Sequence, residues 1–290
     1  MSIFLKNHKI TNNFSQSINH YNYVLNDSEP IFNPHGIWEP LVYSFELLIQ
    51  EFCLIKGYES RPAGIAPKLL AEGLNFDSHQ KILQSDFVKK IVVLEQLVMD
   101  HQTLIQGNYR PGEEIDKALY KKSIYHHKKL NNAYNRYISD DQNQELSDAA
   151  IRKLGKLIYT VRSNVAHGAK TPYGPDEEQV KRDNKVLKIC TPILKVIIEE
   201  LYGAPSEKFF VYGTLMPGKE NFNIIKEIDG EWIDLELSGS ITEKSGLKYF
   251  NWNPNSNDKV EGKILISKKL PYYWKDIDRF EGSRYKRQIG

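Results

Sequence analysis

The spacing of apolar residues changes at Gly203-Ala204-Pro205-Ser206, and this change constrains the fold of the chain more than any other feature. After this point the Phe, Val and Ile runs shorten and are interrupted by Gly and Asn, which is typical of strands. Before it, apolar residues recur at the spacing of amphipathic helices that pack in a bundle. Four runs have this helical spacing: Leu41 to Ile55, Leu83 to Val98, Ile151 to Val165, and Val180 to Leu201.

The sequence therefore predicts a multidomain protein, an all-α helical bundle followed by a small α+β domain. Its 290 residues exceed what one small domain needs, and an apolar fraction of 40% is enough for two cores. We expect a polar N-terminal arm over 1–34, the helical domain over 35–203, a linker over 204–206 and the second domain over 207–290. The arm is assigned because its Asn-, Ser- and Tyr-rich sequence has no clear period.

Composition predicts a cytoplasmic protein with no membrane span, no cofactor and no metal. The N-terminus lacks the charged start and apolar run of a signal peptide, and the apolar stretch from Ile189 to Ile198 contains Pro192 and Lys195. Pro192 is expected to kink the last helix. Cys53 and Cys190 lie on apolar helix faces and are expected to be reduced core thiols. Metal-ligand spacings and nucleotide-binding fingerprints do not occur in the sequence.

Two motifs of the second domain point to chemistry. A strand of aromatic and β-branched residues ends at Tyr212, and Gly213 frees the backbone to turn so that successive N–H groups can converge on an anion. A short helix then begins near Pro271 and ends at Glu281, with Gly282 in the position of its C-terminal cap. An acid at that end is disfavoured by about 0.3–1 kcal/mol, so helix stability does not explain Glu281. One face of this helix is predicted to be apolar, carrying Leu270, Trp274, Ile277 and Phe280.

The two motifs together resemble the gamma-glutamylcyclotransferase-like family, and more closely its gamma-glutamylamine cyclotransferase branch. The resemblance covers 207–290 and implies a small barrel whose closing strands lie beyond Gly290, so the domain is expected to be incomplete. It implies a small gamma-glutamyl substrate, whose α-amine attacks its own γ-carbonyl and releases 5-oxoproline and an amine. Glu281 matches the family's catalytic carboxylate, and its pKa would have to be raised by burial for it to act as general acid and base at neutral pH. The loop that holds the gamma-glutamyl group is matched by Tyr212, Gly213, Thr214 and Leu215.

A motif in the helical region has a second resemblance. Arg162 and His167 are separated by four residues, and this Arg-x4-His resembles the signature of the HEPN superfamily (higher eukaryotes and prokaryotes nucleotide-binding). The resemblance covers 35–203 and implies an all-helical homodimer in which Arg162 and His167 cleave RNA without a metal. Ser163 stands where the superfamily more commonly has Asn. A scaffold interpretation remains open, in which His167 lies near a helix C-terminus and Arg162 pairs with a neighbouring acid.

A basic segment bears on whether the helical domain contacts RNA. Between Lys117 and Arg136 there are six Lys or Arg and no acid, interleaved with tyrosines. Such a face suits a phosphate backbone, although many such runs are only solvated helix surfaces. The candidate RNA contacts are Lys121, Lys122, Lys128 and Lys129, and the interleaved tyrosines are Tyr120, Tyr125 and Tyr134.

Three functions therefore follow from the sequence. The leading hypothesis is cyclotransferase chemistry at Glu281. The alternative is a metal-independent ribonuclease or RNA-binding effector that uses Arg162 and His167. In a third hypothesis neither domain is catalytic and the chain is a dimerising interaction module.

Overall fold

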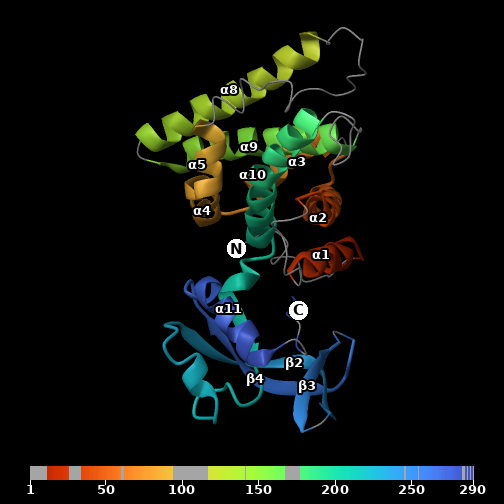
Figure 1. Ribbon diagram of the computed structural model, residues 1–290, viewed down its shortest axis with the longest axis vertical. Coiled ribbons are helices and arrows are strands. Elements are labelled where there is room, and N and C mark those ends of the chain that lie inside the picture. The colour runs from red at the N-terminus through yellow and green to blue at the C-terminus, as the bar shows by residue number, and fades with distance from the viewer. Residues whose placement is uncertain are drawn as a thin grey trace. The chain divides into compact units, whose positions relative to one another are not determined.

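The computed structural model resolves the chain into two compact units, Met1–Gly203 and Ala204–Gly290 (Figure 1). The first is helical and the second contains an antiparallel sheet, as the change of apolar spacing predicts. The structure describes residues 12–25, 34–59, 62–93, 117–140, 142–166, 177–244, 246–253, 255–282, 285, 287 and 289.

The first unit is a bundle whose core is formed by the predicted apolar stripes. Leu41 and Phe52 of α2, Leu154 of α9 and Leu194 of α10 are fully buried. Figure 1 shows α9 alongside α8, and α9 also packs on α3. In the part of the chain that the structure describes, no helix is long and apolar enough to cross a membrane. The helices are α1 (Asn12–Leu25), α2 (Pro34–Lys56), α3 (Pro62–Gly73), α4 (Phe76–Gln84), α5 (Asp86–Val93), α8 (Lys117–Ser139), α9 (Gln144–Ala166) and α10 (Glu177–Leu201).

The predicted polar arm is wrong over Asn12–Leu25, which form α1 and pack against α2. Ser17, Tyr21 and Val24 are buried, and their spacing is that of one helix face. Because one of these three is Ser and another Tyr, the stripe is concealed by its polarity. The remainder of the expected arm falls outside the described residues.

The run from Leu83 to Val98 forms two helices where one was predicted. Ser85 ends α4 in extended backbone, and its hydroxyl accepts a hydrogen bond from the Val88 N–H at the start of α5. Ser is a strong N-cap, so this residue begins a new helix although the apolar spacing continues across it. Leu94 and Val98 lie outside the described residues. Pro192 lies inside α10, which is a single helix over its whole range.

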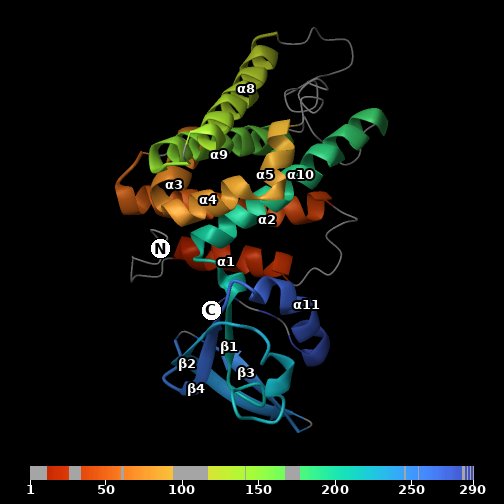
Figure 2. The same ribbon diagram turned by 90° about the vertical axis from the view of Figure 1, so that its left-hand side faces the viewer.

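Among its described residues, the second unit contains a four-stranded antiparallel sheet and one α-helix (Figure 2). Its strand order is β1-β4-β2-β3, with Phe210 opposite Ile264 and Gly262 opposite Leu235. Short 3-10 turns at Pro205–Glu207 and Phe222–Ile224 precede β1 and β2. The other elements are β1 (Lys208–Val211), β2 (Glu231–Lys244), β3 (Leu247–Trp252), β4 (Lys259–Ile266) and α11 (Leu270–Glu281).

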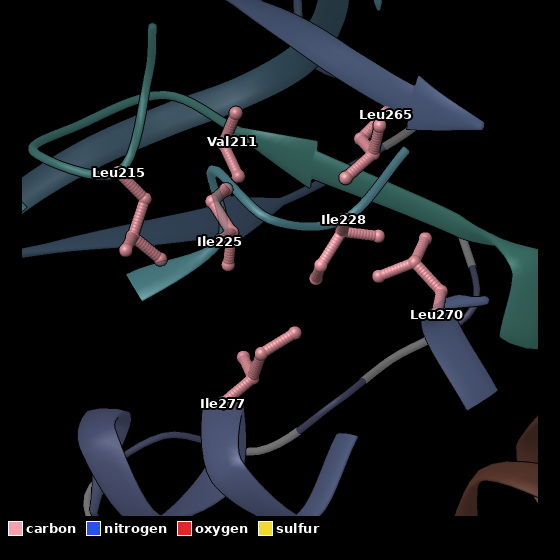
Figure 3. Packing of buried hydrophobic residues seen from close by; sticks show 7 residues of the cluster. All are labelled: Val211, Leu215, Ile225, Ile228, Leu265, Leu270 and Ile277. Carbon is pink, nitrogen blue, oxygen red and sulfur yellow. The ribbon is translucent and has the colours of Figure 1, made fainter. Parts of the chain in front are cut away.

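One apolar cluster joins the sheet, the segment between β1 and β2, and α11 (Figure 3). Leu270 and Ile277 of α11 are buried in it and Trp274 packs against it, as predicted, but Phe280 is 41% exposed. Phe280 lies in the last turn of α11, beyond the cluster. Leu215 is also buried here, so the start of the segment between β1 and β2 is anchored to the same core as the helix that carries Glu281. The cluster comprises Val211, Leu215, Ile225, Ile228, Leu265, Leu270 and Ile277.

Candidate active site at the end of strand β1

Glu281 is the last residue of α11, and the sequence places it there through the glycine that follows. Gly282 has φ 73°, in the left-handed region, and its N–H donates to the Asp278 carbonyl at 2.9 Å. This closes the helix and leaves Glu281 at its negative end. The Glu281 side chain is half-buried, and burial raises the pKa of its carboxyl. Within the described residues the carboxyl has no hydrogen-bond or ion-pair partner, so it can bind a ligand or transfer a proton.

The Tyr212–Leu215 loop offers backbone donors. Its form is fixed by hydrogen bonds from the Met216 N–H to the Gly213 carbonyl at 3.2 Å and from the Asn221 N–H to the Thr214 carbonyl at 2.9 Å. Asn221 Nδ2 also donates to Thr214 Oγ1 at 2.9 Å. The N–H groups of Gly213, Thr214 and Leu215 have no acceptor among the residues described. Three successive donors without an acceptor in the described chain are available to an anion or an oxyanion.

Tyr212, at the start of this loop, interacts electrostatically with Glu281. Burial raises the pKa of the Tyr212 phenol, and the negative charge of Glu281 raises it further. The two groups therefore lie within electrostatic range of each other. The hydroxyl of Tyr212 accepts a hydrogen bond from the Phe250 N–H at 3.0 Å and donates to the Lys248 carbonyl at 3.2 Å. Because the hydroxyl is engaged in these two bonds, the predicted contact of Tyr212 with substrate would be made by its backbone or its ring.

The residues after α11 pack around the same region. The Tyr285 ring stacks on Tyr249 with 5.0 Å between centroids, and its hydroxyl donates to the Lys248 carbonyl at 3.3 Å. Arg287 pairs with Asp278 at 3.2 Å and places its guanidinium 5.1 Å from the centre of the Trp274 ring. These contacts fix the chain that leaves α11 against the helix and β3.

The part played by β3 was missed from the sequence. Lys248 and Phe250 carry nothing in the sequence that marks them as partners of Tyr212, more than thirty positions earlier. The contact uses backbone groups of β3, so no side-chain motif in the sequence indicates it. The alternation of residues in β3 predicts its two faces and gives no information on what lies at its edge.

In the helical unit, Arg162 is engaged in a structural contact. Its guanidinium forms an ion pair with Glu46 of α2 and lies 5.5 Å from the centre of the Tyr159 ring. This contact favours the scaffold interpretation of the Arg-x4-His motif. His167 lies outside the described residues, so the predicted Arg–His pair stays a prediction.

The basic segment lies on α8. Lys128 and Lys129 are exposed, whereas the side chains of Lys121 and Lys122 lie outside the part of the chain that is described. Tyr134 is buried in the bundle, so it cannot stack on a base as a nucleic-acid face would require.

Where the structure describes side chains, no group of three or more His, Cys, Asp or Glu is arranged to hold a metal ion.

Comparison of the chain with models of known protein families, with curated proteins and with solved structures gave no match. The functional assignment therefore rests on the motif residues and their geometry.

Proposed function

We propose that the second unit is a gamma-glutamylcyclotransferase-type enzyme that releases 5-oxoproline from gamma-glutamyl amines or peptides. The observation that carries the proposal is the half-buried Glu281 carboxyl, which has a raised pKa and no partner among the described residues. Glu281 acts electrostatically on Tyr212, the first residue of a loop with three successive N–H groups that have no acceptor in the described chain. A proton-transferring group next to an oxyanion cradle is what intramolecular acyl transfer requires.

The reaction assigns one role to each part. The α-amine of the gamma-glutamyl group attacks the γ-carbonyl, a C–N bond forms, and the Glu281 carboxylate takes the proton that the nitrogen loses. The N–H groups of Gly213, Thr214 and Leu215 stabilise the negative charge that develops on the carbonyl oxygen. The bond to the leaving nitrogen then breaks, and Glu281 returns its proton to that nitrogen. The products are 5-oxoproline and the free amine.

The environment of Glu281 suits this exchange. An exposed glutamate is too weak a base to remove a proton efficiently at neutral pH, and burial moves its pKa toward the working range. The same burial makes protonated Glu281 easier to maintain, so one group can act first as base and then as acid.

The ribonuclease hypothesis is not part of this proposal, because the Arg162 guanidinium is engaged by Glu46.

Glu281→Gln tests the proposal, since it preserves the shape of the side chain and removes the transferable proton. We expect 5-oxoproline release from a gamma-glutamyl amine to fall by roughly 10²–10⁴-fold, the usual contribution of a general acid or base. The matched control is Glu261→Gln, which makes the same change at an exposed position of β4 and should leave the rate unchanged. If Glu281→Gln retains the wild-type rate, Glu281 is not the proton-transferring group.

A further inference from the structure

The sheet ends in two strands that each have one neighbour among the described residues, and a single tyrosine connects them. In the order β1-β4-β2-β3, β1 pairs with β4 and β3 pairs with β2. Tyr212 is the first residue after β1, yet its hydroxyl bonds to the Phe250 N–H and the Lys248 carbonyl of β3. A side chain at the end of one outer strand therefore holds backbone groups of the other outer strand.

The two groups on β3 are those that a further strand would use. Residues two apart in an antiparallel strand direct their backbone groups to the same side, so Lys248 and Phe250 both present theirs away from β2. The Tyr212 hydroxyl accepts from one and donates to the other, the two roles that a backbone carbonyl and a backbone N–H of a neighbouring strand would share. This one phenol therefore substitutes locally for a strand partner.

Ring packing supports the same connection. The Tyr212 ring lies 5.6 Å from the Phe250 ring and 6.2 Å from the Phe210 ring, and Phe210 and Phe250 are 5.6 Å apart. Two glycines leave room for this cluster. A Cβ on Gly239 would come within 2.7 Å of the Phe250 ring, and a Cβ on Gly262 within 2.6 Å of the Phe210 ring.

The connection has a consequence for the loop. Tyr212 is fixed to β3 at one end of the Tyr212–Leu215 loop, and Leu215 is buried in the apolar cluster at the other end. The three N–H groups of the cradle lie between these two anchors. Resting on the proposed function, we infer that Tyr212 is a positioning residue whose hydroxyl ties the end of β1 to the outer edge of β3 and so holds the oxyanion cradle beside Glu281.

Tyr212→Phe is the direct test, because it keeps the ring and removes both hydrogen bonds. We expect kcat per folded molecule to fall roughly 10–100-fold with little change in KM. A displaced cradle loses more of its stabilisation of the transition state than of its binding of the ground-state substrate. The matched control is Tyr249→Phe on β3, whose hydroxyl has no hydrogen bond to any described residue and whose removal should leave kcat unchanged. A variant that lost only stability would keep its kcat per folded molecule, and that result would overturn the inference.

Amide hydrogen exchange in the wild-type protein is a second test, which requires neither an activity nor a variant. The amide of Phe250 should exchange with solvent more slowly than that of Lys248, which faces the same side of β3 without an acceptor in the described chain. Equal exchange at the two amides would overturn the inference. In folded Tyr212→Phe, Phe250 exchange should accelerate and the amide shifts of Gly213, Thr214 and Leu215 should change. If both occur in a protein that releases no 5-oxoproline, the positioning role stands and the proposed function fails.

Discussion

Glu281 holds its proton more tightly than an exposed glutamate because its half-buried carboxyl lacks a compensating partner among the described groups. As the proposed general base it must be ionised, so kcat/KM should rise with pH through the pKa of the free enzyme. That pKa is raised from its ordinary value of 4.5, and the midpoint of the acidic limb should therefore lie above pH 4.5. A pH–rate profile measures it, and a midpoint at or below 4.5 would contradict the assignment.

The same shift makes a stability prediction for the same residue. Since the folded pKa lies above the unfolded one, Glu281 contributes stability below pH 4.5 and loses that contribution as pH rises through the folded pKa. The free energy of unfolding of wild type, relative to Glu281→Gln, should therefore fall over that range. Denaturant titrations at several pH values provide the measurement.

At Arg162, the local sequence supports two interpretations, and the ion pair with Glu46 favours the scaffold. The Arg-x4-His pattern is compatible with catalysis and with a scaffold, because its role depends on what faces the guanidinium. Glu46 faces it from α2, far away along the chain, and no spacing within the motif could have revealed this partner. Glu281 differs, because the conflict between its charge and the helix dipole is visible in the sequence itself.

At the scale of elements, α1 is held to the bundle by three buried hydroxyls. The Tyr202 hydroxyl is 2.5 Å from Ser17 Oγ and 2.9 Å from Ser44 Oγ, and Ser17 Oγ donates to the Ser44 carbonyl at 2.7 Å. Tyr202→Phe keeps the ring and removes its hydrogen bonds, so we expect the free energy of unfolding to fall by about 0.5–1.5 kcal/mol. Chemical denaturation measures the difference.

Tyr23→Phe is the control for that substitution, since Tyr23 also lies on α1 and is 66% exposed. It should change stability by no more than about 0.5 kcal/mol. Equal effects of the two substitutions would mean that the buried hydroxyls do not secure α1.

The elements that could be predicted are those whose signal is local. Apolar stripes predicted α2, α9 and α10, and Pro271 with Gly282 predicted both ends of α11, whereas α3 was not predicted. Helix α1 was missed because its buried face includes Ser17 and Tyr21, and the break between α4 and α5 was missed because Ser85 interrupts backbone geometry without interrupting the apolar spacing. Strand order and the contact of Tyr212 with β3 depend on long-range pairing, which a single sequence does not encode as a pattern.

At the scale of the whole molecule, each unit has a core of its own. Leu154 is fully buried in the helical unit and Leu265 in the second unit. Domains with separate cores can in principle fold alone, so we expect two unfolding transitions. Replacing either leucine by alanine should destabilise its own unit by roughly 2–5 kcal/mol, the usual cost of a buried Leu→Ala change, and leave the other transition unchanged.

Hydrogen exchange in increasing denaturant, followed separately on peptides of each unit, distinguishes the two transitions. With Leu265→Ala, peptides of β1 to β4 should lose protection at lower denaturant while peptides of α2, α9 and α10 keep the wild-type midpoint. Leu154→Ala should produce the reverse. If either substitution shifts both sets of peptides together, the chain unfolds as one cooperative body, and a change at Arg162 would then alter the proposed activity of the second unit through stability alone. Independent transitions would mean that the effect of Glu281→Gln on activity can be interpreted within the second unit.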